Sequence, residues 1–258
     1  MYYVEAGTGE PLVLVMGFGA DHLAWGFQMP AFAERYRVVA FDNRGVGQTD
    51  QPDQPYTTRH MAADTVGLMD ALGIDRAHVL GVSMGGMIAQ EIALNYGDRV
   101  RTLQLHCTYA RPDGQTRAQL AAWRVQRAVL SREDALRSSF FWLFARDTYN
   151  ERPEFVEAML RNALANPYPQ SVTGWLRQAE ACLTHDTLER IAAIRCPTLV
   201  GVAAEDILVP PRCSREIAAR VPGAELRMIE SVGHVYFWER PDAFNALCLE
   251  FLGAHAGV

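Results

Sequence analysis

Short apolar runs alternate with longer stretches of helical periodicity along the first hundred residues of the chain. The runs Pro11–Met16 (PLVLVM) and Arg37–Phe41 (RVVAF) are almost wholly apolar, whereas Thr58–Leu72 carries its apolar residues as a stripe. Continuously apolar strands separated by helices are typical of a parallel sheet that is covered on both faces. We predict strands at Tyr2–Ala6, Pro11–Met16, Arg37–Phe41, His78–Val82 and Val100–His106, and helices at Thr58–Leu72 and Met84–Tyr96.

The pattern changes between residues 111 and 195, where no strand signal stands out and the sequence indicates several helices. Breaks fall at Asp113-Gly114, Arg152-Pro153 and Asn166-Pro167. Strand and helix signals then alternate again through Cys196–Ala203, Pro211–Val221, Ala224–Ile229 and Pro241–Leu252. The predicted fold class is α/β, with a mostly parallel sheet and helices on both faces. We expect residues 1–110 and 196–258 to form the core domain and residues 111–195 to form a helical cap inserted in it.

Composition excludes several classes of function. The 258 residues carry a net charge of −6 and include 24 arginines but no lysine. Without lysine, Schiff-base chemistry, a phosphate-loop lysine and a Ser–Lys dyad are all excluded. The negative charge and the absence of basic runs argue against nucleic acid as a partner. Five cysteines without a CxxC spacing, no apolar run of about 18 residues and no secretory leader predict a cytoplasmic protein that spans no membrane.

The strongest chemical signal is the segment from His78 to Met87, which reads HVLGVSMGGM. Gly81, Ser83 and Gly85 form a G-x-S-x-G motif between a predicted strand and a predicted helix. Such a turn is so sharp that side chains at the glycine positions would clash, and it presents the serine hydroxyl above the sheet. The following helix adds N–H groups and positive potential where an oxyanion would form. Ser83 is therefore the candidate nucleophile.

A serine nucleophile needs a base, and the base needs an acid that orients it. After a strand–turn–helix serine, the acid comes first along the chain and the histidine second. His234 follows the last predicted strand, at the sheet edge where α/β sites form, whereas His255 lies in a Gly/Ala-rich tail. Asp206 lies in the loop after the preceding strand, and its neighbour Glu205 is the alternative acid. The spacing to the following proline favours Asp206, so we predict Asp206 and His234 as the partners of Ser83.

A tetrahedral oxyanion is stabilised by two backbone donors. The first should be the N–H of Met84, the residue directly after the candidate nucleophile. The second should come from the loop after an earlier strand, and Met16-Gly17-Phe18-Gly19 offers the Phe18 N–H. A simple glycine turn is the alternative interpretation of that segment.

Together these segments resemble the α/β-hydrolase superfamily over essentially the whole chain. Asp42 to Asp50 (DNRGVGQTD) is similar to the family's D-x-R-G-x-G-x-S/T loop, and Gly233 to Pro241 resembles its histidine loop and last helix. The chain looks most like small capped hydrolases grouped around 3-oxoadipate enol-lactonase, microbial carboxylesterases and cofactor-free haloperoxidases. The resemblance implies no cofactor and no metal. Haloalkane dehalogenases and epoxide hydrolases of this fold need a carboxylate where this chain has Ser83.

Two features depart from the family's pattern. The family usually has His-Gly after the strand, whereas this chain has Met16-Gly17, so the loop that carries Phe18 should be braced differently or move more. The chain also begins close to its first strand. We therefore expect the family's usual edge strand to be missing or shortened.

The predicted function is hydrolysis of a small-molecule carboxylic ester or lactone through an acyl-enzyme intermediate. C–C bond hydrolysis or cofactor-free haloperoxidase chemistry on the same triad is one alternative. A sensor that binds a small ligand in a hydrolase-like pocket is another. The sequence does not specify the assembly, and a homodimer is compatible with it.

Substrate binding is predicted at two aromatic clusters. Phe140, Trp142 and Phe144 lie in the predicted cap, although helix-spaced aromatic residues are usually core. Tyr236 and Phe237, followed by a tryptophan, lie beside the candidate base in sequence. The cap also carries a small excess of arginine over acidic residues, which would suit an acidic substrate.

Overall fold

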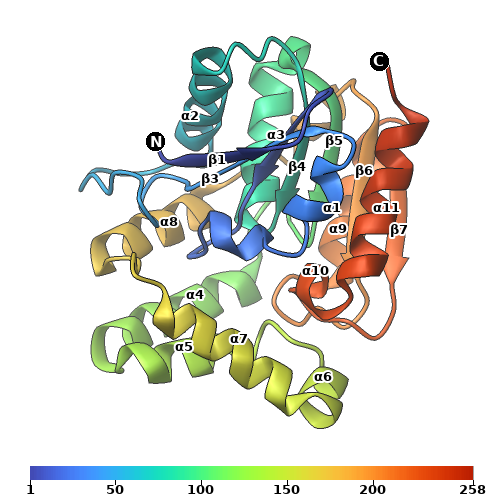
Figure 1. The fold of residues 1–258 in the computed structure, drawn as a ribbon. Coiled ribbons are helices and arrows are strands. Elements are labelled where there is room, and N and C mark those ends of the chain that lie inside the picture. The colour runs from blue at the N-terminus through green and yellow to red at the C-terminus, as the bar shows by residue number, and fades with distance from the viewer. Residues whose placement is uncertain (258) are drawn as a thin grey trace.

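The computed structural model describes residues 1–257, which contain one sheet of seven strands (Figure 1). The strands are β1 (Tyr3–Ala6), β2 (Pro11–Val15), β3 (Arg37–Phe41), β4 (Ala77–Val82), β5 (Val100–His106), β6 (Thr198–Ala203) and β7 (Glu225–Ile229). Their order across the sheet is β1-β3-β2-β4-β5-β6-β7. The edge strand β1 runs antiparallel to β3, and all other neighbours are parallel. The predicted mostly parallel sheet is confirmed.

Side chains of each central strand alternate between two hydrophobic layers, as the pleat of a strand requires. Leu12 and Leu14 of β2 pack into one cluster, and Val13 and Val15 pack into the other. The helices α2 (Thr58–Ala71), α3 (Met84–Asn95) and α9 (Pro211–Arg220) cover the valine face. The helices α1 (Met29–Ala33) and α11 (Pro241–Ala254) cover the leucine face. Because both faces of the central strands are buried, these strands are mostly apolar and could be predicted from the sequence.

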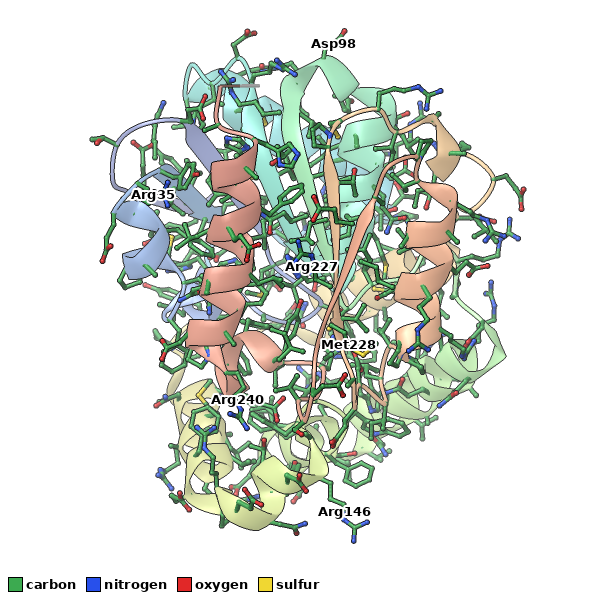
Figure 2. The ribbon with its side chains drawn as sticks, turned by 90° about the vertical axis from the view of Figure 1, so that its right-hand side faces the viewer. Arg35, Asp98, Arg146, Arg227, Met228 and Arg240 are labelled. Atoms are coloured by element: carbon green, nitrogen blue, oxygen red, sulfur yellow. The ribbon has the colours of Figure 1, made fainter. Side chains whose placement is uncertain are left out.

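Between β5 and β6 the chain forms helices only. They are α4 (Gly114–Val129), α5 (Arg132–Phe140), α6 (Arg146–Glu151), α7 (Pro153–Ala165), α8 (Val172–Thr184) and the short 3-10 helix η3 (Ile191–Ala193). Asp113, Ser131 and Ser171 cap α4, α5 and α8 through their side-chain oxygens. We call residues 111–195 the helical segment. It lies at one end of the sheet, around Arg146, and Asp98 before β5 marks the opposite end (Figures 1 and 2).

Short helices are the elements that the sequence pattern did not predict. The five residues of α1 and the four of α10 (Tyr236–Glu239) make little more than one turn each, so no periodic stripe can develop. The longest helix, α4, has 16 residues. Across residues 1–257 no helix has both the length and the apolar composition that crossing a bilayer would take.

Candidate active site

Ser83 occupies a sharp turn between β4 and α3. Its backbone has φ 57° and ψ −121°, a conformation that costs a non-glycine residue about 1–3 kcal/mol. The Ser83 N–H donates to the carbonyl of His106 at 2.8 Å, which ties the turn to β5. A Cβ atom at Gly81 would lie 2.3 Å from the Gly85 oxygen, and one at Gly85 would lie 1.9 Å from the Val15 oxygen. The two glycines of the motif are therefore required by close backbone approach.

His234 and Asp206 form a buried pair beside this turn. The His234 Nδ1 lies 2.7 Å from the Asp206 Oδ2, and both side chains are almost fully buried. The other carboxylate oxygen accepts hydrogen bonds from the N–H groups of Leu208 and Val209 at 2.9 and 2.8 Å. Because the carboxylate only accepts, it fixes the proton on Nδ1 and leaves Nε2 as the acceptor. The structure thus brings Asp206 to the histidine, whereas the alternative acid Glu205 is exposed.

Cys107 lies behind this pair. Its sulfur lies within 4.8 Å of ligand atoms of Asp206 and His234, a grouping that could in principle hold a metal. Burial, followed by the nearby Asp206 charge, raises the pKa of the Cys107 thiol well above its usual value. A metal needs a thiolate, so the chemistry of this donor set does not suit one.

A second acidic cluster consists of Asp21, His22 and Asp42. The Asp42 oxygens accept from the N–H groups of His22 and Gln48, both at 2.8 Å, and the His22 Nδ1 lies 2.7 Å from one of them. The Asp21 oxygens accept from the Leu23 N–H and from an asparagine side chain of the helical segment. These carboxylates already have protein donors, so we interpret the cluster as a support for the loop after β2.

Two backbone N–H groups are placed to serve an oxyanion. Met84 is the first residue of α3, so its N–H lies at the positive end of that helix. The Phe18 N–H belongs to the loop after β2, and a Cβ atom at its neighbour Gly17 would lie 3.1 Å from the Ser83 Cβ. Within residues 1–257 neither N–H donates to a protein acceptor. The loop therefore packs directly against the candidate nucleophile and brings a second donor close to it.

Met16 stands where the family usually has histidine, and other residues brace this loop. The Asn43 side chain donates to the Met16 carbonyl at 2.9 Å. The Gly19 N–H donates to Gln178 of α8 at 3.0 Å, and Gln178 in turn donates to the Arg44 carbonyl at 2.9 Å. The helical segment therefore supplies part of the support for this loop that a histidine at position 16 would otherwise give.

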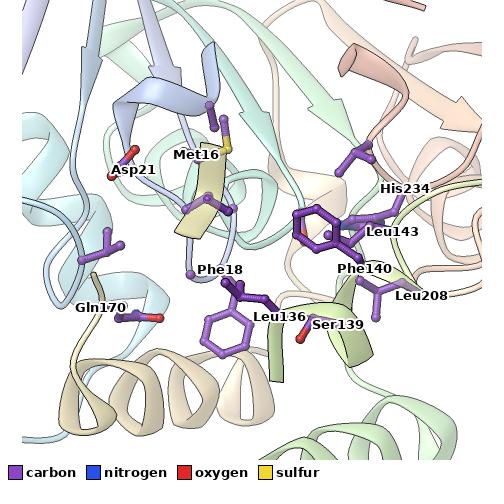
Figure 3. A pocket seen from close by; sticks show the side chains of 18 of the residues that line it. Met16, Phe18, Asp21, Leu136, Ser139, Phe140, Leu143, Gln170, Leu208 and His234 are labelled. Carbon is purple, nitrogen blue, oxygen red and sulfur yellow. The ribbon is translucent and has the colours of Figure 1, made fainter. Parts of the chain in front are cut away.

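Ser83 and His234 line one cavity of about 710 Å³ (Figure 3). Its walls come from the loop after β2, from α4, α5 and α8, and from the histidine loop. The labelled side chains Phe18, Leu136 and Leu143 face this space together with His234 (Figure 3). Most of the wall is apolar, so the site can exclude water around a bound apolar group.

The five aromatic residues predicted to bind substrate divide into two groups. Phe140 and Phe237 line the cavity. Tyr236 does not, because its side chain points behind the site, where its hydroxyl bonds to the buried His106 ring. Adjacent residues of a helix face different directions, so closeness to His234 in the sequence does not show which side chain reaches the cavity.

Trp142 and Phe144 do not line this cavity either. Phe144 is buried within the helical segment, where its ring contacts Tyr149 and Phe155 at 6.1 Å between centroids. Trp142 packs beside Phe141 and against the larger of the two hydrophobic clusters, which includes residues of α4 and α8. Both side chains serve packing between helices, which is the alternative that the aromatic spacing had left open.

Sequence reasoning missed several cavity residues because only the packing of the helices identifies them. Trp123 of α4, Leu136 of α5, Met159 of α7 and Trp175 of α8 all line the cavity. The Trp175 ring lies 5.0 Å from the Phe18 ring, so it covers the loop that carries the candidate oxyanion donor. No motif marks these positions in the sequence.

Glu239 links the histidine loop to the helical segment. One carboxylate oxygen accepts from the Gly233 N–H at 2.6 Å, directly before His234. The other accepts from the Ala145 N–H at 2.9 Å and from the Thr148 hydroxyl at 2.5 Å. Burial raises the pKa of Glu239, and these three donors oppose that effect. The position of the histidine is therefore coupled to the start of α6.

Comparison with known proteins places this geometry in context. The model of the family described as alpha/beta hydrolase fold matches residues 10–241. A Caulobacter protein named as the carbamate hydrolase RutD is 35% identical, with 97% of this chain and 93% of the relative covered.

Solved structures give the same picture. A Mycobacterium tuberculosis protein named as the non-heme bromoperoxidase BpoC superposes with a TM-score of 0.91 at 32% identity, covering 99% of this chain and 96% of that one. The enol-lactonase of Burkholderia xenovorans superposes with a TM-score of 0.89 at 27% identity, covering 98% and 96%.

Proposed function

Because the chain belongs to the α/β-hydrolase fold family, we propose that it is a serine hydrolase that cleaves a carboxylic ester or lactone. The observation that carries the proposal is the Asp206–His234 pair beside a cavity that Ser83 also lines. Ser83, His234 and Asp206 are assigned the roles of nucleophile, base and orienting acid. The helical segment would act as the cap over this site.

The proposed reaction begins when His234 Nε2 takes the Ser83 hydroxyl proton and the serine oxygen attacks the substrate carbonyl. The N–H groups of Met84 and Phe18 would hold the oxyanion of the tetrahedral intermediate. The protonated His234 would then give its proton to the leaving alcohol, which leaves an acyl-enzyme. Water activated by the same imidazole would release the acid, and the Asp206 carboxylate would stabilise the imidazolium in both halves.

Ester or lactone cleavage suits this cavity because the reacting carbonyl is neutral and the walls are mostly apolar. The enol-lactonase structure, with 27% identity, supports this substrate class. A panel of nitrophenyl esters and lactones should give turnover with the wild-type chain. The Ser83→Ala variant should lose it by about three orders of magnitude or more.

A matched control for this experiment is Ser138→Ala, which removes a hydroxyl of α5 that bonds to Gln126 instead of the candidate triad. It should keep most of the activity. Ester hydrolysis that persists in Ser83→Ala would refute the assignment of the nucleophile. A wild-type chain with no turnover on the whole panel, yet with measurable affinity for an ester, would favour the sensor alternative.

Perhydrolysis is the second candidate, and the bromoperoxidase relative favours it. In that reaction hydrogen peroxide replaces water as the acceptor of the acyl group, and the same triad would serve. Bromination in peroxide and acetate should be compared with ester hydrolysis at equal enzyme concentration. A carbamate ester belongs in the same panel because of the relative named as a carbamate hydrolase.

A further inference from the structure

Two buried nitrogen atoms in the wall of the catalytic cavity have no hydrogen-bond partner within residues 1–257. They are the side-chain amide nitrogen of Gln119 and the indole nitrogen of Trp123. Each side chain is only 8% exposed, and both line the cavity that holds Ser83. Buried donors of this kind are rare in native proteins, and each one calls for an explanation.

Both residues belong to α4 and lie four positions apart, so their side chains are neighbours on one face of the helix. The same face carries Leu120, which also lines the cavity. Helix α8 packs against α4 and adds Trp175 and Cys182 to this part of the wall. The two donors therefore lie side by side in a buried part of the cavity wall.

A polar group in such surroundings costs free energy unless a partner satisfies it. Trp25 also has an unpartnered indole nitrogen, but it does not line the cavity. A ligand in the cavity can approach Gln119 and Trp123, and it cannot approach Trp25. The pair of donors thus differs from an ordinary packing defect in being placed at a binding surface.

We propose that Gln119 and Trp123 form a subsite for a neutral acceptor oxygen of the substrate, away from the bond that is cleaved. This inference rests on the proposed function and narrows its substrate class to esters or lactones that carry a second oxygen, such as a ketone, amide or ester carbonyl. A carbonyl oxygen has two lone pairs and can accept from both donors.

The test compares nitrophenyl hexanoate with analogues whose chain carries one ketone at successive positions. With the wild-type chain, one ketone position should raise kcat/KM over the plain ester by about tenfold, the effect of one or two added hydrogen bonds. Trp123→Phe removes the indole N–H and keeps most of the ring, and Gln119→Met keeps the length of the side chain. Each variant should reduce that ratio toward one.

Trp25→Phe is the matched control, since it removes an unpartnered indole N–H outside the cavity, and the ratio should stay at the wild-type value. Ser83-dependent hydrolysis without any ketone preference would overturn the subsite and leave the proposed function intact. A preference that survives in both Trp123→Phe and Gln119→Met would overturn it as well.

A binding measurement separates the two proposals if hydrolysis fails. Calorimetry on the Ser83→Ala protein should show the same ketone analogue binding about tenfold more tightly than the plain ester, and Trp123→Phe in that background should remove the difference. Equal affinities would refute the subsite whatever the catalytic result.

Discussion

At the scale of single residues, the two oxygens of the Asp206 carboxylate have different roles, one in holding the local fold and one in the proposed catalysis. One oxygen accepts from two backbone N–H groups, and the other meets the His234 ring. Asp206→Asn can keep the oxygen that accepts from the backbone, but its NH₂ group would then face Nδ1. That contact favours the imidazole tautomer with the proton on Nε2, which cannot accept the serine proton. We expect kcat to fall by about 10³–10⁴ while the unfolding midpoint changes little. Glu205→Gln, on an exposed neighbour, should leave kcat near the wild-type value; equal losses in both variants would contradict the assignment.

Glycine at position 85 is required for a steric reason. Comparing Gly85→Ala with the same substitution at an uncrowded helical glycine separates this steric effect from the general effect of replacing glycine by alanine. An alanine Cβ at position 85 would lie 1.9 Å from the Val15 carbonyl oxygen, so the end of β2 must shift. We expect Gly85→Ala to destabilise the fold by about 3 kcal/mol, the cost of overpacking a core. A Cβ atom at Gly67 in α2, by contrast, would have no atom within 4 Å. Gly67→Ala should therefore stabilise the fold by roughly 0.5–1 kcal/mol. Urea unfolding of both variants measures the difference, and similar values would refute the steric argument.

The candidate triad could be predicted from the sequence because each member follows a strand, and strand ends fix their places at one edge of the sheet. Phe18 and Met84 could be predicted for the same reason. The aromatic pocket residues could be predicted only in part. Whether Phe140 faces the cavity and Phe144 faces the helices depends on how α5, α6 and α7 pack, and aromatic spacing alone carries no such information.

At the scale of elements, the structure shows how one side chain couples α10 to the helical segment. Glu239 accepts from Gly233, Ala145 and Thr148, so its carboxylate joins the histidine loop to the start of α6. Glu239→Gln replaces one acceptor oxygen by an NH₂ group that must face a donor. We expect kcat to fall by about tenfold or more with a smaller change in KM, because His234 is displaced while the cavity wall persists.

The control for that experiment is Glu250→Gln on the exposed side of α11, which should leave both constants unchanged. Thr148→Val removes one of the three donors to Glu239 and should give an intermediate loss of kcat. Should Glu239→Gln alter KM alone, the coupling to the histidine would be wrong, and Glu239 would act only on the cavity wall. A loss that follows the melting temperature in every variant would indicate a purely structural role.

The parallel direction of the strands followed from physical rules more directly than their order across the sheet or the arrangement of the helices did. Apolar strands joined by helices are expected to lie parallel, with helices on both faces, and β2 to β6 do so. The four residues of α10 and the packing of α4 against α8 depend on contacts between residues far apart in the sequence. Such contacts leave no local pattern in the sequence. The helices of residues 111–195 could therefore be predicted, but how they pack against one another could not.

At the scale of the whole molecule, buried histidines make stability depend on pH. Burial lowers the pKa of His106 and of His185 to about 3, below the ordinary value of 6.5. Between those values the unfolded chain binds protons that the folded chain does not, so the free energy of unfolding must fall as the pH falls from about 6.5 toward 3. Glu239 acts in the opposite sense, because burial raises its pKa and its protonation favours the folded state.

Each of the two histidines should contribute a slope of about 1.4 kcal/mol per pH unit in that window. Urea unfolding at about pH 7, 6 and 5 should therefore show a declining free energy of unfolding. His185→Gln removes one titrating group from a site where the ring bonds to Thr58 and lies beside Gln90. The variant is expected to be less stable at neutral pH yet to lose stability less steeply on acidification, because its unfolded chain gains one proton fewer. Parallel curves for the two proteins would show that His185 titrates alike in the folded and unfolded states.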